Sequence, residues 1–307
     1  MKKYGLLASL YLIAQSSLFA QEPAYINYNA ALGGALTSFV QKADTALWSA
    51  SLASLQKSAR TVQEEAPVGL PLEKKGTTKK AFTDEALYAN RKSGVVVIGN
   101  LRKGTAGNNI NFEVKGTGFF ITKEGHCVTN FHVVQELLQS TPPTDGLVYF
   151  VITEDRKVYA INGLLAYSKN NDLAVLSING GGQGFNAIPL GQPAVVGAPV
   201  YCISHPAGEF YYFSKGMVAR NLIRDSTALG VTYSASGKTP IRMEVTADYG
   251  GGSSGGPLID QYGNLVGIVA TTSTIYLNEQ LPQGVRQHPQ MVIKDAVPVK
   301  ALTGLLQ

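Results

Sequence analysis

The glycine-rich segment from Gly250 to Asp260, GGGSSGGPLID, places a serine where it could attack a carbonyl group. Ser254 lies within a run of glycines, and Gly-Gly-Pro and an apolar stretch follow it. An attacking serine needs a tight turn that no neighbouring side chain covers, with backbone N–H groups free to point at the oxyanion that develops. The segment therefore indicates a nucleophile, although a turn of glycine and serine also occurs simply as a loop.

Two other residues could activate this serine. His132 lies in CVTNFHVV, at the end of a β-branched run that predicts a strand and just before VVQELL, which predicts a short helix. Asp172 lies in NNDLAVLSI, at the start of an amphipathic strand. Alone, each would most simply be a structural histidine or a surface aspartate. Together with the serine they are the residue types of a nucleophile, a general base and an acid that orients the base.

In the chain order His132, Asp172 and Ser254, these segments resemble the trypsin-like serine peptidases, and in particular their bacterial HtrA-like branch. TNFHVV is similar to the histidine box of that branch, NNDLAVLSI to its aspartate box, and GSSGGPLID to its serine box. Its connecting strands and C-terminal helix resemble GTGFFIT, HPAG, FSKGMVA, GNLVGIVA and AVPVKAL. The resemblance spans about Thr83 to Gln307. It implies an all-β fold of two six-stranded antiparallel Greek-key barrels, the first carrying the histidine and aspartate and the second the serine.

The resemblance also implies a role for each site residue. Ser254 would form an acyl-enzyme, His132 would act as general base, and Asp172 would orient the imidazole. The backbone N–H groups of Gly252 and Ser254 would form the oxyanion hole. The strand residues that would pair with an extended polypeptide substrate are Val269, Ala270 and Thr271. The expected activity is that of a secreted serine endopeptidase that needs no cofactor.

Three features depart from the pattern of the resembled families. Ser253 stands where many trypsin-like enzymes carry an aspartate that receives a new N-terminus, so we expect no activation by that route. Asp248 could form the floor of a pocket that selects Lys or Arg, but HtrA-like enzymes often have a nearby aspartate without that role. The sequence ends directly after the expected terminal helix, so we expect no PDZ domain. The alternative function is a catalytically silent peptide-binding or chaperone-like protein on the same fold, although none of the three catalytic residue types is missing.

Short apolar runs separated by glycine and proline fill the chain after Thr83 and predict strands. The predicted strands are Val95–Ile98, Gly118–Thr122, Cys127–Thr129, Val148–Ile152, Leu173–Ile178, Val200–Ile203, Ile241–Val245 and Leu265–Ala270. DEALYANRK predicts a helix before them, and AVPVKALTGLL predicts one after them. We expect a first barrel over residues 83–188, and a second barrel with the C-terminal helix over residues 189–307.

An N-terminal helical extension and linker are expected over residues 21–82. Apolar residues at steps of three and four predict one amphipathic helix from Ala35 to about Glu64, with two offset apolar stripes. It could be a docked structural helix, a removable pro-segment, or an arm that joins copies of this chain. Ala66 to Ala81 is predicted to be a linker, and its cluster of Lys74, Lys75, Lys79 and Lys80 a solvated stretch.

Residues 1–20 have the order of a secretory signal, with two lysines, an apolar run and small residues up to Ala20. We therefore expect export to the periplasm or the exterior and no stable membrane span after signal removal. The formal net charge of +5 falls to +3 without Lys2 and Lys3, which is too small to indicate nucleic acid binding. Cys127 and Cys202 are expected to be buried thiols, and neither they nor the four histidines have zinc-ligand spacing, so no metal is expected.

Overall fold

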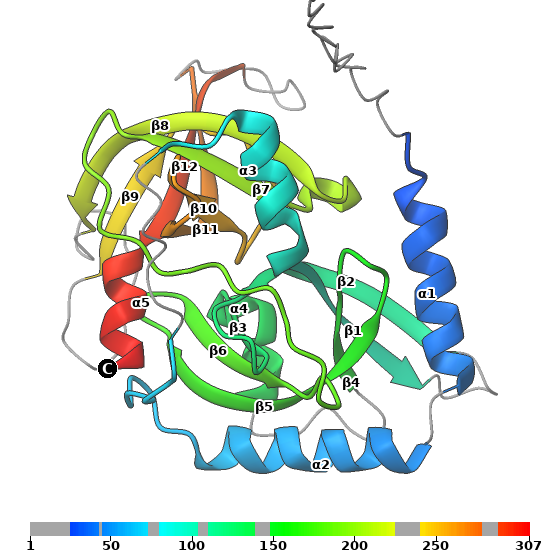
Figure 1. Ribbon diagram of the computed structural model, residues 1–307. Coiled ribbons are helices and arrows are strands. Elements are labelled where there is room, and N and C mark those ends of the chain that lie inside the picture. Colours follow the sequence, from blue (N-terminus) through cyan, green and yellow to red (C-terminus); the bar gives the residue numbers. More distant parts are fainter. Residues whose placement is uncertain are drawn as a thin grey trace, which may run out of the picture.

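The computed structural model describes residues 25–42, 45–72, 80–103, 110–138, 148–224, 240–277 and 288–307. The chain forms two closed six-stranded antiparallel barrels, which confirms the predicted fold class (Figure 1). The expected signal segment and Lys74, Lys75 and Lys79 lie outside the described residues. Within the described ranges, no helix combines the length and the apolar character that crossing a bilayer would require.

The first barrel has the strand order β1-β2-β3-β6-β5-β4. Its strands are β1 Val95–Lys103, β2 Ile110–Phe120, β3 His126–Thr129, β4 Val148–Ile152, β5 Val158–Ser168 and β6 Leu173–Ile178. Every residue of β4 is buried, because its two faces pack into two different clusters. Phe150 on one face packs with Leu32 and Leu36, and Tyr149 on the other packs with the barrel interior. Burial on both faces produces a continuous apolar run rather than an alternating one.

The second barrel has the order β10-β11-β12-β9-β8-β7. Its strands are β7 Pro199–Ser204, β8 Tyr212–Ile223, β9 Ile241–Val245, β10 Pro257–Ile259, β11 Leu265–Tyr276 and β12 Pro289–Pro298. The short β10 directly follows the turn that contains Ser254. The predicted C-terminal helix is present as α5, Val299–Leu306. The expected boundary between the barrels, at residues 188 and 189, lies in the connection between β6 and β7.

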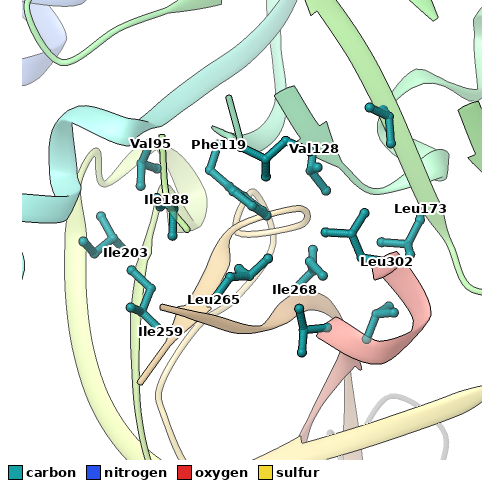
Figure 2. Close-up of a cluster of buried hydrophobic side chains, with 14 of the residues drawn as sticks. Val95, Phe119, Val128, Leu173, Ile188, Ile203, Ile259, Leu265, Ile268 and Leu302 are labelled. Carbon is teal, nitrogen blue, oxygen red and sulfur yellow. The ribbon is translucent and has the colours of Figure 1, made fainter. Parts of the chain in front are cut away.

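A shared apolar core joins the two barrels (Figure 2). Its buried side chains include Val95, Phe119, Val128 and Leu173 of the first barrel, Ile203, Ile259, Leu265 and Ile268 of the second, and Leu302 of α5. Burying such side chains contributes about 1.5–3 kcal/mol each, so this core fixes the barrels against each other. A fixed interface is what a site built from both barrels requires.

The N-terminal segment forms two helices, α1 Tyr28–Lys42 and α2 Thr45–Thr61, so the prediction of a single helix from Ala35 to about Glu64 was wrong. Figure 1 shows α1 and α2 running in different directions, with α2 along β5. The physical reason is the offset between the two apolar stripes. Leu36 of α1 and Leu55 of α2 both face the first barrel only because the chain changes direction between the helices. The described apolar side chains Leu32, Leu36, Leu55 and Ala59 of the extension are thus buried within this chain, and oligomerisation through it stays a prediction.

The described part of the expected linker is packed rather than free. Val68 N donates to Leu305 O at 3.0 Å, and Val68, Leu70 and Leu72 lie against the core between the barrels. After residues 73–79, the helix α3, Asp84–Arg91, begins with Thr83 as its N-cap, whose side chain accepts from Ala86 N. The expected helix DEALYANRK is therefore confirmed.

Candidate active site

His132 and Asp172 are in direct contact at the edge of the first barrel. His132 lies in the short helix α4, Phe131–Val134, and Asp172 lies in the turn before β6. His132 Nδ1 is 2.8 Å from Asp172 Oδ2, and His132 N donates to Asp172 Oδ1 at 3.0 Å. Asn130 Nδ2 also donates to Asp172 O at 2.9 Å. With Nδ1–H donated to the carboxylate, the other ring nitrogen, Nε2, is the one free to accept a proton.

The turn around Ser254 depends on glycines at two positions. Gly252 has φ +91° and Gly255 has φ +83°, which are left-handed conformations. A Cβ atom at Gly252 would come within 2.6 Å of His205 O, and one at Gly255 within 2.3 Å of Thr117 O. The glycine-rich sequence is therefore needed for the path of the backbone, as well as for access to Ser254.

Hydrogen bonds hold the peptide planes of this turn. The donors and their acceptors are Ser253 N to Gly250 O (3.0 Å), Ala207 N to Gly251 O (2.6 Å), Thr117 Oγ1 to Gly252 O (2.9 Å), Gly256 N to Ser253 O (2.8 Å) and Thr117 N to Ser254 O (2.9 Å). An amide N–H points away from the carbonyl of its own peptide group. In the described part of the chain, the N–H groups of Gly252 and Ser254 donate to no acceptor, which leaves them available for an oxyanion.

Ser254 lies beside the helix that carries His132. Both residues belong to the described part of the chain, and their side chains form no hydrogen bond with each other. A Cβ at Gly116 would lie 3.0 Å from both Ser254 O and the side chain of Val133, so only a glycine separates the two segments. Ser254 Oγ instead donates to Ala270 O at 3.5 Å. Catalytic hydrogen bonds are often long in a free enzyme and tighten when substrate binds.

Ser253 has a structural role at the position before the nucleophile. It is fully buried, and its Oγ accepts from Gly250 N at 3.3 Å and from Ser204 Oγ at 3.0 Å. These two hydrogen bonds between neutral groups hold the beginning of the turn.

Sequence reasoning missed two residues that support the turn. Thr117, in GTGFFIT, bridges the barrels, because its Oγ1 accepts from His205 N at 3.2 Å and donates to Gly252 O. His205, in HPAG, is fully buried, and burial lowers its pKa to about 3. The neutral Nδ1 of His205 accepts from Tyr211 N at 3.0 Å. From sequence, GTGFFIT and HPAG resembled only connecting strands. Their hydrogen bonds to the turn could not be predicted, because a long-range hydrogen bond leaves no periodic pattern in the sequence.

The three residues predicted to pair with substrate, Val269, Ala270 and Thr271, differ in whether their backbone groups are already hydrogen-bonded. Val269 N donates to Gly256 O at 2.8 Å and Val269 O accepts from Gly255 N at 3.0 Å, so the prediction that Val269 pairs with substrate was wrong. Ala270 O accepts from Ser254 Oγ. From Thr271 onward, β11 pairs only with β12 among the described strands, because its pairing with β10 reaches no further than Ile268, opposite Pro257 at the start of β10. The open edge of β11 thus begins at Thr271.

Asp248 is exposed and does not form the floor of a buried pocket, which argues against the alternative in which it selects Lys or Arg. Its side chain is 73% exposed, and its Oδ1 lies 2.8 Å from Lys294 Nζ. Lys294 belongs to β12 and neutralises the carboxylate. A charge that faces solvent and already has a partner offers little attraction to a cationic side chain.

Both cysteines are free and buried, which confirms that prediction. Burial raises the pKa of the Cys127 thiol well above its usual value and that of Cys202 to about 12. Neither thiol therefore forms a nucleophilic thiolate near neutral pH. The described ranges hold no group of three or more His, Cys, Asp or Glu side chains that could bind a metal ion.

Comparison with known proteins identifies a family whose members resemble this chain. The family described as "Trypsin-like peptidase domain" matches residues 116–268, which include His132, Asp172 and Ser254. The chain has a trypsin-like peptidase domain. Among curated relatives, "Protease Do-like 5, chloroplastic" of Arabidopsis thaliana is 31% identical over 170 residues, which are 54% of this chain and 50% of that protein. "Probable periplasmic serine endoprotease DegP-like" of Brucella suis is 30% identical over 156 residues, which are 50% of this chain and 27% of that protein.

Solved structures of similar proteins agree with this fold. "Crystal structure of Deg5" is 25% identical with a TM-score of 0.50 and covers 71% of this chain and 88% of its own. "HtrA-type protease AlgW with decapeptide" is 20% identical with a TM-score of 0.53 and covers 72% of this chain and 66% of its own, which is a likeness of fold alone. The trypsin-like peptidase domain of this chain is thus similar to HtrA and Deg proteins, and the chain spans half or less of the curated relatives named above.

Proposed function

We propose that this chain is a serine endopeptidase in which Ser254, His132 and Asp172 form the catalytic triad. The observation that carries the proposal is the two-point contact between His132 and Asp172, on the segment next to Ser254. The contact to the backbone N–H of His132 fixes where the carboxylate lies, and the contact to Nδ1 fixes the ring and its tautomer.

In the proposed reaction, His132 Nε2 takes the proton of Ser254 Oγ as the oxygen attacks the scissile carbonyl. Attack breaks the carbonyl π bond and places its electron pair on the oxygen, next to the N–H groups of Gly252 and Ser254. When the tetrahedral intermediate collapses, the peptide C–N bond breaks and the imidazolium gives its proton to the leaving amine. A water molecule then hydrolyses the acyl-enzyme by the same steps, with His132 again as base.

The proposed substrates are extended polypeptides that pair with the open edge of β11. The support for this proposal is the short pairing between β10 and β11, which stops at Ile268 and leaves the later residues of β11 with a partner strand on only one side. Backbone pairing recognises the extended conformation rather than one particular side chain. The pairing of Asp248 with Lys294 is consistent with the same view, because an exposed carboxylate with a partner offers little attraction to a cationic residue.

The proposed location is outside the cytoplasm, on the strength of the signal-like residues 1–20. The name of the Brucella suis relative describes a periplasmic protein, whereas that of the Arabidopsis thaliana relative describes a chloroplastic one. Expression with its own N-terminus in a bacterium, followed by cell fractionation and N-terminal sequencing, tests the location. We expect an exported chain that begins near Gln21, and a cytoplasmic chain that begins at Met1 would contradict export.

Hydrolysis of casein tests the proposed activity. The purified protein should cleave casein, and Ser254→Ala should reduce the rate by at least about 10⁴-fold. The neighbouring Ser253→Ala is the matched control, and it should retain measurable hydrolysis at a reduced rate, since its hydroxyl holds Gly250 N. Casein that is bound but never cleaved would instead support the peptide-binding or chaperone-like alternative.

A further inference from the structure

The end of the N-terminal extension contacts the turn that carries Asp172. Glu65 N donates to Tyr167 O at 2.8 Å, and Glu64 forms a parallel β-bridge with Tyr167. The carboxylate of Glu64 accepts from Lys169 N at 3.3 Å and lies 3.6 Å from Lys169 Nζ. Residues directly after α2 are therefore attached, through backbone and side chain, to the segment three to five residues before Asp172.

A second contact runs through a buried hydroxyl. Ser168 Oγ donates its single proton to Glu65 Oε1 at 3.2 Å. With the proton directed to Glu65, the lone pairs of Ser168 Oγ accept from Asn171 N at 3.1 Å and from Asn171 Nδ2 at 3.3 Å. Asp172 N donates to Lys169 O at 3.2 Å and closes the same turn. Glu65 thus sets the direction of the hydroxyl on which the turn is built.

The same segment reaches the histidine side of the pair. The ring of Tyr167 stacks on that of Phe131, with centroids 5.4 Å apart. Lys169 Nζ lies 6.0 Å from the centre of the Phe131 ring, within the range of a cation–π contact. Because Phe131 directly precedes His132, the extension supports the chain on both sides of the hydrogen bond between His132 and Asp172.

Support from outside the turn matters because Asp172 has an uncommon backbone conformation. Its φ is +56°, in the left-handed region that non-glycine residues adopt at a modest cost. Such conformations persist where the surroundings fix them. Asp172 must also reach two atoms of His132 at once, so a small shift of the turn would break at least one of these contacts.

We propose that Glu64 and Glu65 are positioning residues for the catalytic pair, and that the N-terminal extension is a built-in activator of the peptidase domain. The inference rests on the proposed function of His132 and Asp172. It assigns the extension a role different from a removable pro-segment, because loss of its contacts lowers the activity instead of releasing it.

Two measurements on the purified full chain test this role. The first is hydrogen–deuterium exchange of the backbone from Ser168 to Leu173, which needs no enzymatic activity. The second is kcat and KM for casein. Glu65→Ala and Ser168→Ala remove the shared hydrogen bond, whereas Glu65→Gln keeps an oxygen that accepts it. Glu154→Ala is the control, since it removes another first-barrel carboxylate, bonded to Lys92 at 2.8 Å.

We expect faster exchange across this turn in Glu65→Ala and Ser168→Ala, and a kcat about tenfold lower with KM within about twofold, since displaced catalytic groups cost rate. Glu65→Gln should restore kcat to within about threefold of the original, because a neutral acceptor replaces a charged one. Glu154→Ala should change neither measurement. The double variant with Glu65→Ala and Ser168→Ala should lower kcat no more than either single variant, because both remove the same hydrogen bond.

Unchanged exchange in Glu65→Ala would overturn the proposal, and so would faster exchange with an unchanged kcat. Higher activity in Glu65→Ala would show that the extension inhibits the enzyme. If Glu65→Ala unfolds, Ser168→Ala and Glu65→Gln still test the proposal. Full activity in Ser168→Ala would contradict a positioning role for the contact between Glu65 and Ser168. Failure of the proposed function is distinct, since it appears as an unmutated protein that does not cleave casein.

Discussion

The two barrels share a topology but differ in how they are covered. The helices α1 and α2 cover strands of the first barrel, so that β4 is buried at every position. In the second barrel, β8, β11 and β12 extend into segments whose apolar residues, such as Met217, Ile275 and Met291, are exposed. The covered barrel carries His132 and Asp172, the proposed acid–base pair, and the more open barrel carries Ser254, the proposed nucleophile, and the open edge of β11. The difference suggests that the first barrel supplies fixed geometry and the second supplies access for a polypeptide.

The largest expected effect comes from the covered barrel. His132→Ala should lower kcat for casein by about 10⁴- to 10⁶-fold, because the serine loses its base and the leaving amine its acid. His126→Ala is the matched control, as it removes another histidine of the same barrel, one bonded to Thr122. Comparable losses in the two variants would mean that the barrel itself had been damaged, and that His132 has no special chemical role.

The contact between the barrels should have the next largest effect. Thr117→Val keeps the size of the side chain but removes the donor to Gly252 O and the acceptor for His205 N. We expect kcat to fall about tenfold to a hundredfold, somewhat less than on loss of an oxyanion donor itself. Thr117→Ser should restore most of the rate, since it keeps the hydroxyl.

Thr122→Val is the control for this variant, because Thr122 is equally buried and its hydroxyl bonds His126 and the carboxylate of Glu124. It should lose stability in urea denaturation without a matching loss of kcat. An equal loss of kcat in Thr122→Val would show that Thr117 has no specific role in holding the turn around Ser254.

The buried histidine of the second barrel should make stability depend on pH. The folded protein holds the pKa of His205 at about 3, below its ordinary value of 6.5, so the unfolded chain binds the extra proton between these values. Stability from this residue is therefore present above about pH 6.5 and falls by about 1.4 kcal/mol per pH unit as the pH drops towards 3.

Urea denaturation of the unmutated protein and of His205→Gln at pH 7, 6 and 5 measures this dependence. The unmutated protein should lose stability more steeply than the variant as the pH falls. Parallel curves would show that His205 exchanges protons equally in the two states and does not hold the turn as a neutral acceptor.

The smallest effect is expected at the exposed edge of the second barrel. Asp248→Asn should leave the cleavage preference for Lys or Arg over other residues unchanged within about twofold, because Lys294 already neutralises an exposed carboxylate. A peptide-library cleavage profile measures this ratio. A marked loss of cleavage after Lys or Arg would restore Asp248 as a specificity residue.

Much of this arrangement could be predicted from sequence, for physical reasons that differ between segments. Val148–Ile152 and Leu173–Ile178 are short, mainly apolar runs, whereas Ile241–Val245 alternates apolar and charged residues, and each is a strand with the predicted bounds. Other strands, such as β5 and β12, were not predicted, because no clear period marked them; β5 is half-buried at five positions, and β12 begins with four exposed residues.

The site was predicted only in part, because its supports are long-range contacts. The hydrogen bond from Thr117 to Gly252 joins residues 135 positions apart, and no local pattern records it. Val269 looked available to a substrate until the turn after Ser254 proved to occupy its backbone groups. The extension could be predicted as helical from its apolar spacing, but Glu65 and its contact with Ser168 depend on the final fold.

The most direct test of the central claim is peptide mapping of the purified protein after reaction with a fluorophosphonate. We predict one adduct, located on Ser254 in the segment from Gly250 to Asp260, and no adduct in Ser254→Ala. We also predict that labelling of Ser254 slows by at least about 10³-fold in His132→Ala, since the serine then lacks its base. An adduct on another residue, or equally fast labelling of Ser254 without His132, would contradict the proposed triad.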